Sequence, residues 1–246
     1  MTFADRHAVL AAGYGDQPDP EDPARVLAMP LVLHIPKADP PARSALLAAA
    51  ASATVALCLD PRVDAQDDDG VPGPWRADYL AWTRARIRKV ARRARGAQWS
   101  ATADVDGVTA DVDGAQARAF VPVAVGDLDP RVKKLQIGGT DLPDDEPGAP
   151  EAGKPVFWLD ARLGMTVGKA AAQVGHAAMI LAGAMTVDEA RAWADDGFRC
   201  SVRGADEDTW RGLLQRVSRG DAIAVRDAGF TEVAPGSTTV VGTRSA

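Results

Sequence analysis

The stretch VFWLDARLGMTVGKAAAQVGHAAMILAG, residues 156–183, decides how the second half of the chain folds. Its first four residues are apolar and predict a short buried strand. A loop around Gly164 follows, and the run from Gly168 to Gly183 is rich in Ala and Gly, which is typical of a helix that packs closely against a sheet. This strand–loop–helix order is the beginning of an α/β unit.

The residues after this helix predict the rest of a small sheet. Thr186 and Glu189 have the spacing of a capping box, so a short helix is expected through Trp193. Further elements are expected as a strand at Phe198–Val202, a helix at Asp206–Val217, and strands at Ala222–Val225 and Thr238–Val241. The order β-α-α-β-α-β-β predicts the α/β class, with a small mixed four-stranded sheet and helices on its faces, in a domain of residues 151–246.

A linker rich in Pro, Gly and acidic residues, DDEPGAPEAGKP at 144–155, separates this half from residues 1–150. There we expect an N-terminal α+β domain. Its predicted elements are a strand at Leu31–Ile35, a helix at Pro41–Leu59 and a basic helix at Trp75–Gly96. A likeness between residues 31–52 and 156–176 indicates either a decayed repeat of one strand–helix unit or the ordinary similarity of Ala-rich helices.

The sequence ADVDG occurs twice between Ala103 and Gly114. A calcium loop of the EF-hand kind needs a Glu at a fixed distance after its Gly, and that residue is missing here. Asp-Gly pairs between runs of Val and Thr predict hairpin turns instead.

The charge of the chain argues against nucleic-acid binding through bulk charge. The 246 residues contain 28 Lys and Arg against 34 Asp and Glu, a formal net charge of −6. Seven basic residues nevertheless stand between Arg84 and Arg95. On a helix Arg84, Arg88, Arg92 and Arg95 would share one face, which predicts contacts with the phosphates of a nucleic acid; the alternative is a solvated helix face.

Cysteine usage and hydropathy predict a cytoplasmic protein without a membrane partner. Cys58 and Cys200 are far apart and have no CxxC spacing, so neither a disulfide framework nor a zinc site is expected. No secretion signal or membrane span is evident, and no cofactor is expected. The oligomeric state is left open, and a homodimer is compatible with the sequence.

Three polar residues of the predicted helix at 168–183 are candidates for chemistry. Lys169, Gln173 and His176 are spaced i, i+4 and i+7, so they share one stripe of the helix. Gly168 and Lys169 stand at the helix N-terminus, where free N–H groups and the helix dipole favour an anion. The loop before them lacks the spacing and the Ser or Thr of a Walker A motif. Gln173 and His176 could instead form hydrogen bonds within the fold.

A second polar segment, RDAGFTEVAPGSTTVVGT at 226–243, follows the strand expected at 222–225. If that strand runs parallel to the strand at 156–159, the carboxyl ends of both lie at one edge of the sheet. Asp227 and Thr231 would then face Lys169. The plain structural alternative is a turn-rich connection between two strands.

The segments GKAAAQVGHAA, at 168–178, and 226–243 together resemble the peptidyl-tRNA hydrolase type 2 family over roughly residues 155–243. The resemblance implies hydrolysis of the ester that joins a peptide to tRNA, with peptidyl-tRNA as partner. By position it places the family's site residues on Lys169, Gln173, His176, Asp227 and Thr231, and it implies that Gly168 lies where the tRNA binds. The chain departs from the family at three positions, because Val167, Phe230 and Glu232 replace the usual Lys, Arg and Gln.

Ester hydrolysis needs a positioned water, a group that accepts its proton and a group that stabilises the oxyanion. We expect Asp227 to orient or deprotonate the water and Thr231 to hold the carboxylate or the substrate. Lys169, with nearby helix N–H groups, would stabilise the oxyanion or a terminal phosphate, and no metal would take part. Two alternatives are a non-catalytic tRNA-binding or interaction module on the same fold and an esterase or deacylase of another acyl substrate.

Overall fold

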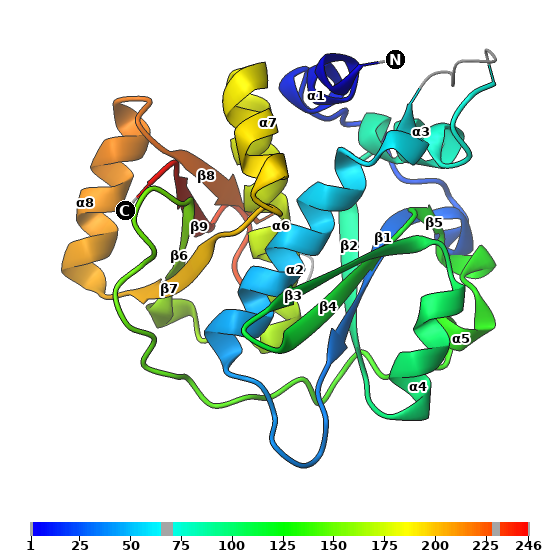
Figure 1. The fold of residues 1–246 in the computed structure, drawn as a ribbon, viewed down its shortest axis with the longest axis horizontal. Helices are drawn as coiled ribbons and strands as arrows, with labels where there is room; N and C mark the ends of the chain where they lie inside the picture. The colour runs from blue at the N-terminus through cyan, green and yellow to red at the C-terminus, as the bar shows by residue number, and fades with distance from the viewer. Residues whose placement is uncertain (1, 65–70, 228–231, 246) are drawn as a thin grey trace.

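The computed structural model describes residues 2–64, 71–227 and 232–245, which form two mixed β-sheets with helices between and around them (Figure 1). One sheet comes from each half of the chain. The linker predicted at 144–155 runs along the lower edge of the view, from the first sheet to the second. Within the described residues no helix has both the length and the hydrophobicity needed to cross a bilayer.

The second half has the predicted α/β architecture. Its elements are β6 (Val156–Asp160), α6 (Val167–Ala184), α7 (Val187–Asp195), β7 (Ser201–Ala205), α8 (Glu207–Ser218), β8 (Ile223–Arg226) and β9 (Thr238–Thr243). The strand order is β7-β6-β9-β8, with β7 parallel and β9 antiparallel to β6. The capping box of Thr186 and Glu189 begins α7, as predicted.

The first half holds the other sheet. Its main elements are α1 (Phe3–Ala11), β1 (Leu27–His34), α2 (Arg43–Cys58), α3 (Arg76–Arg84), β2 (Arg88–Ala94), α4 (Ala97–Ser100), β3 (Gly107–Val112), β4 (Ala115–Phe120), β5 (Val123–Ala124) and α5 (Pro130–Lys133). Single-turn 3₁₀ helices occur in this half at Pro23–Arg25, Pro61–Val63, Ala101–Asp104 and Val125–Asp127, and in the second half at Ala161–Leu163. The strand order is β2-β1-β4-β3, and β5 pairs with β1.

The prediction of one continuous basic helix over Trp75–Gly96 is wrong. The chain is helical only in α3, turns at Ile87, where φ is +41°, and continues as β2, which pairs in parallel with β1. The indole N–H of Trp82 donates to the carbonyl of Arg88 over 3.0 Å and holds this turn. Strand pairing satisfies the backbone polar groups of β2 and outweighs the helix propensity of its Arg and Ala residues.

The second ADVDG sequence forms the hairpin turn between β3 and β4, as predicted. Asp113 and Gly114 both have positive φ, 51° and 81°, which is the conformation of a type I′ turn. The backbone N–H of Gly114 also donates to the carboxylate of Asp111 over 2.9 Å. The first copy leads into β3 instead.

The two halves follow the same chain path. In each, a strand, two helices, a parallel strand and an antiparallel hairpin form a sheet of the same strand order. Trp193 donates to the carbonyl of Arg199 over 2.8 Å, the counterpart of the Trp82 bond, and Phe198 has a positive φ of 57° at the position of Ile87. These correspondences favour the decayed repeat over a chance likeness.

Helices α2 and α6 pack against each other between the sheets and carry the core (Figure 1). Both are rich in Ala, and a Cβ placed on Gly175 of α6 would lie 2.9 Å from the hydroxyl of Thr54 in α2, so the helices touch closely. The largest buried cluster includes Met29 and Leu46 from the first half and Phe157 from the second. The halves therefore share one hydrophobic core, and a domain boundary at 150/151 stays a prediction.

Candidate active site

A cavity of about 570 Å³ opens between the two halves. Its lining includes the polar stripe of α6, the end of β8 and residues of β2, which is the outermost strand of the first sheet. Lys169, Gln173 and His176 all line it, together with Asp227. The structure thus brings these four predicted residues to one cavity.

Asp227 lies where the predicted geometry places it. Strands β6 and β8 are both antiparallel to β9, so they run in the same direction and end at the same edge of the sheet. The backbone of Asp227 is anchored by two hydrogen bonds, from its N–H to the carbonyl of Ser237 over 2.9 Å and to its carbonyl from the N–H of Gly236 over 2.7 Å. Thr231 and Phe230 lie outside the described residues.

The carboxylate of Asp227 is held in a buried polar cluster. Its Oδ2 pairs with the Nζ of Lys169 and accepts a 2.8 Å hydrogen bond from the side-chain amide of Gln173. The hydroxyl of Thr239 in turn donates to Oε1 of Gln173 over 2.6 Å, which fixes the orientation of that amide. Only 10% of the Lys169 side chain and 6% of the Asp227 side chain are exposed, so both charges are largely removed from water.

His176 lies about two turns after Lys169 on the same stripe. Its Nδ1 is 3.0 Å from the Nζ of Lys89, which comes from β2 in the other half of the chain. Burial, followed by the positive charges of Lys89 and Lys169, lowers the pKa of His176 well below its usual range. The imidazole is therefore neutral near pH 7.

The N-terminus of α6 is occupied by groups of the protein itself. The hydroxyl of Thr166 accepts from the N–H of Lys169, and that of Thr140 accepts from the N–H of Gly168, over 3.2 and 3.0 Å. The carboxylate of Glu232 accepts from the N–H and the hydroxyl of Thr166, over 2.9 and 2.7 Å. The expected free N–H groups are thus engaged, so an anion would have to displace these partners.

Val167, where the family usually has Lys, is the first residue of α6 and is only 2% exposed. It belongs to the shared core. A charged side chain at this position would have to leave the core, which explains in physical terms why this chain carries Val there.

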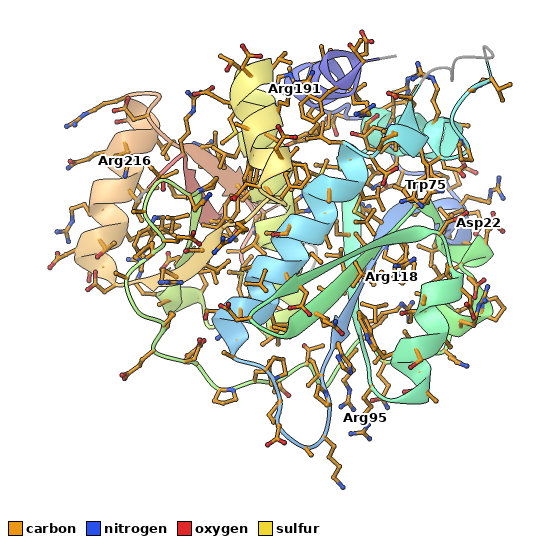
Figure 2. All side chains as sticks on the ribbon, viewed as in Figure 1. Asp22, Trp75, Arg95, Arg118, Arg191 and Arg216 are labelled. Carbon is orange, nitrogen blue, oxygen red and sulfur yellow. The ribbon has the colours of Figure 1, made fainter. Side chains whose placement is uncertain are left out.

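The four arginines expected on one basic face are dispersed, because β2 is a strand. Arg88 lines the cavity, whereas Arg84 ends α3 outside it. Arg92 is buried and donates to the carbonyls of Lys133 and Leu135, over 3.1 and 2.7 Å. Arg95 lies at the lower edge of the molecule beside α4 (Figure 2).

Several cavity residues could not be recognised in the sequence. An acidic segment at residues 14–19 follows α1, and a 2.8 Å hydrogen bond from the N–H of Gly15 to the carbonyl of Thr83 fixes its position. Its Asp16 and Asp19 pair with Arg86 and Arg88 on the cavity wall. The hydrogen bonds from Arg88 lower the pKa of Asp19. No motif marks these contacts, which depend on the packing of the two halves.

Among the described residues, no three His, Cys, Asp or Glu side chains are grouped so that they could hold a metal ion.

Comparison with known proteins identifies the second half of the chain. The family model described as peptidyl-tRNA hydrolase PTH2 matches residues 154–246. A probable peptidyl-tRNA hydrolase 2 of Schizosaccharomyces pombe is 39% identical over 95 residues, which cover 36% of this chain and 46% of that relative. The chain thus spans about half the length of this curated relative. No solved structure matches the chain. The family-model match and this relative together support a C-terminal region of the peptidyl-tRNA hydrolase PTH2 kind at residues 154–246.

Proposed function

We propose that this protein hydrolyses the ester bond of peptidyl-tRNA, so that an N-substituted aminoacyl-tRNA and water give an N-substituted amino acid or peptide and free tRNA. The observation that carries this proposal is the buried cluster of Lys169, Gln173 and Asp227 on the wall of a cavity, within the region that matches the PTH2 family. A role in translation in the cytoplasm is part of the same proposal.

The chemistry follows from the charges in the cluster. Asp227 accepts a proton from the water that attacks the acyl carbonyl, while Gln173 holds the carboxylate in place. The ester C–O bond to the ribose then breaks, and the leaving ribose oxygen takes the proton back from Asp227. The ammonium group of Lys169 stabilises the oxyanion that forms, and its effect is strong because the site is largely shielded from water. Thr231 is proposed to hold the carboxylate or the substrate, and no metal takes part in the step.

The test compares three substrates with the purified full-length protein after treatment with a chelator. An N-acetyl-aminoacyl-tRNA is expected to be hydrolysed, and the free aminoacyl-tRNA and a simple ester of the same amino acid much more slowly. Equal cleavage of all three would favour a general esterase or deacylase. Binding of tRNA without hydrolysis would favour a non-catalytic module, and loss of activity on chelation would contradict the metal-independent step.

Arg88 is the one member of the predicted arginine set that lines the cavity, so it is proposed to contact a tRNA phosphate. An Arg88→Gln variant is expected to bind uncharged tRNA more weakly, and the slope of log affinity against log salt should fall by about 1. Fluorescence anisotropy over a salt series measures both quantities. Arg95→Gln is the matched control, because Arg95 does not line the cavity. Equal effects of the two substitutions would contradict the placement of the RNA.

A further inference from the structure

Because the two halves follow the same chain path, each residue of one half has an equivalent residue in the other. Two contacts between the halves, each joining a residue at a strand to a residue of a helix, are equivalent in this sense. When the Trp82 hydrogen bond is aligned with the Trp193 hydrogen bond, and their positive-φ residues with each other, Lys89 of β2 is equivalent to Cys200, the residue before β7. When the first residues of α2 and α6 are aligned with each other, Ser52 is equivalent to His176. Lys89 contacts His176, with 3.0 Å between Nζ and Nδ1, and Cys200 contacts Ser52, with 3.8 Å between Sγ and Oγ.

The two pairs differ in chemistry, although their places in the fold are equivalent. Cys200 and Ser52 are buried, and Ser52 donates to the carbonyl of Phe198 over 2.8 Å. Burial raises the pKa of the Cys200 thiol to about 12, so this thiol stays neutral. Lys89 and His176, by contrast, are half-buried and line the cavity. Only this pair is placed to act on a bound molecule.

The first half lacks the polar groups of the site at the corresponding positions of α2. Ala45 and Ala49 stand where α6 has Lys169 and Gln173, because the two helices begin 124 residues apart. The tight turn between β3 and β4 stands where the second half has the loop after Asp227. The first half therefore contributes β2 and neighbouring segments to the cavity, and not a second catalytic cluster.

The surroundings of Lys89 hold its side chain in one place. Its Nζ lies 3.0 Å from the sulfur of Met179 and 5.0 Å from the ring centroid of Trp82. Its stem packs over Gly175, where Cδ and Cε would lie 3.3 and 3.4 Å from an added Cβ. Burial lowers the pKa of Lys89 to about 7, and the thiol of Cys58 on α2 acts in the opposite direction. Below that pH, Lys89 is an ammonium group, which has donors only.

We propose that Lys89 is a positioning residue of the site: its ammonium group donates to Nδ1 of His176 and fixes the neutral tautomer that carries its proton on Nε2. In that tautomer His176 offers an N–H donor to an oxygen acceptor in the cavity, such as the ester carbonyl or a ribose hydroxyl. The identity of that acceptor rests on the proposed function. The assignment of the His176 tautomer does not, because it follows from the contact with Lys89. The first half thus completes the site of the second.

The tautomer of His176 can be measured directly by long-range ¹H–¹⁵N NMR on the full chain near pH 6, below the pKa of Lys89. The chain has only three histidines, so His176→Gln identifies the signals. The expected spectrum has a protonated Nε2 and an unprotonated Nδ1. A proton on Nδ1 in the unmodified protein overturns the proposal without any variant that must fold.

Lys89→Met removes the donor and keeps the length of the side chain. In this variant the Nδ1–H tautomer of His176 should appear, and kcat for N-acetyl-aminoacyl-tRNA should fall about tenfold with little change in KM. Lys134→Met, at an exposed position, is the control and should change neither. An unchanged tautomer in Lys89→Met would overturn the proposal. If the unmodified protein hydrolyses no peptidyl-tRNA, the proposed function fails, while the NMR result still decides the role of Lys89.

Discussion

Asp227→Asn is expected to lower kcat for peptidyl-tRNA hydrolysis by about 10² to 10⁴-fold, the range that general acid–base groups contribute. Asn has nearly the same shape and can still accept the hydrogen bond from Gln173, but it cannot take a proton from water. KM should change little, because the RNA contacts are proposed to lie elsewhere in the cavity. Initial rates with N-acetyl-aminoacyl-tRNA measure both constants.

A loss of folding must be separated from a loss of chemistry in this variant. Removing the charge of one partner of a buried ion pair, here that of Asp227 beside Lys169, can cost about 3 kcal/mol of unfolding free energy. Circular dichroism at the assay temperature therefore accompanies the kinetics. Asp195→Asn, at an exposed position of α7, is the matched control and should retain full activity. A folded Asp227→Asn protein with the unmodified rate would falsify the assignment of the base.

Trp82→Ala is expected to lower the free energy of unfolding by about 3 to 5 kcal/mol, the usual cost of removing a large buried aromatic side chain. Trp82 is 0% exposed and belongs to the core cluster that both halves share. It also holds the turn into β2 through its bond to the carbonyl of Arg88. Because β2 carries Lys89 to the cavity, the same variant should weaken activity before it unfolds.

Urea unfolding followed by circular dichroism measures this change, and Trp99→Ala provides the control. Trp99 is half-buried and stacks on His34 with ring centroids 4.8 Å apart, so its removal should cost less. The unmodified chain should unfold in one transition, since α2 and α6 share a core. Two separate transitions, or a loss below about 1 kcal/mol for Trp82→Ala, would contradict the shared core.

The second half was predictable because its signals are local. The apolar run at 156–159 and the capping box of Thr186 and Glu189 mark elements that depend on few distant contacts. Helix α3 lies within the helix predicted at Trp75–Gly96, but strand β2 was not predictable, because its Arg and Ala residues favour a helix in isolation. The pairing of β2 with β1 decides its structure, and that contact joins residues about 60 positions apart.

The distinction between local signals and contacts of distant residues also applies to the candidate active site. Lys169 and Gln173 share a helix face by their spacing, and the direction of β8 brings Asp227 to them, so this cluster could be inferred. The contacts of Thr239 and Lys89 could not, because one lies across the sheet and the other crosses between the halves. The packing of the two halves depends on contacts between residues far apart in the chain, which no local sequence pattern marks.

The most direct test of the account is release of the N-acetyl amino acid from N-acetyl-aminoacyl-tRNA by the full-length protein, measured beside the Asp227→Asn protein at equal concentration. The account predicts rapid release by the unmodified chain and a rate lower by about two orders of magnitude or more for the variant. No release by the folded unmodified chain, or equal release by both proteins, would contradict it.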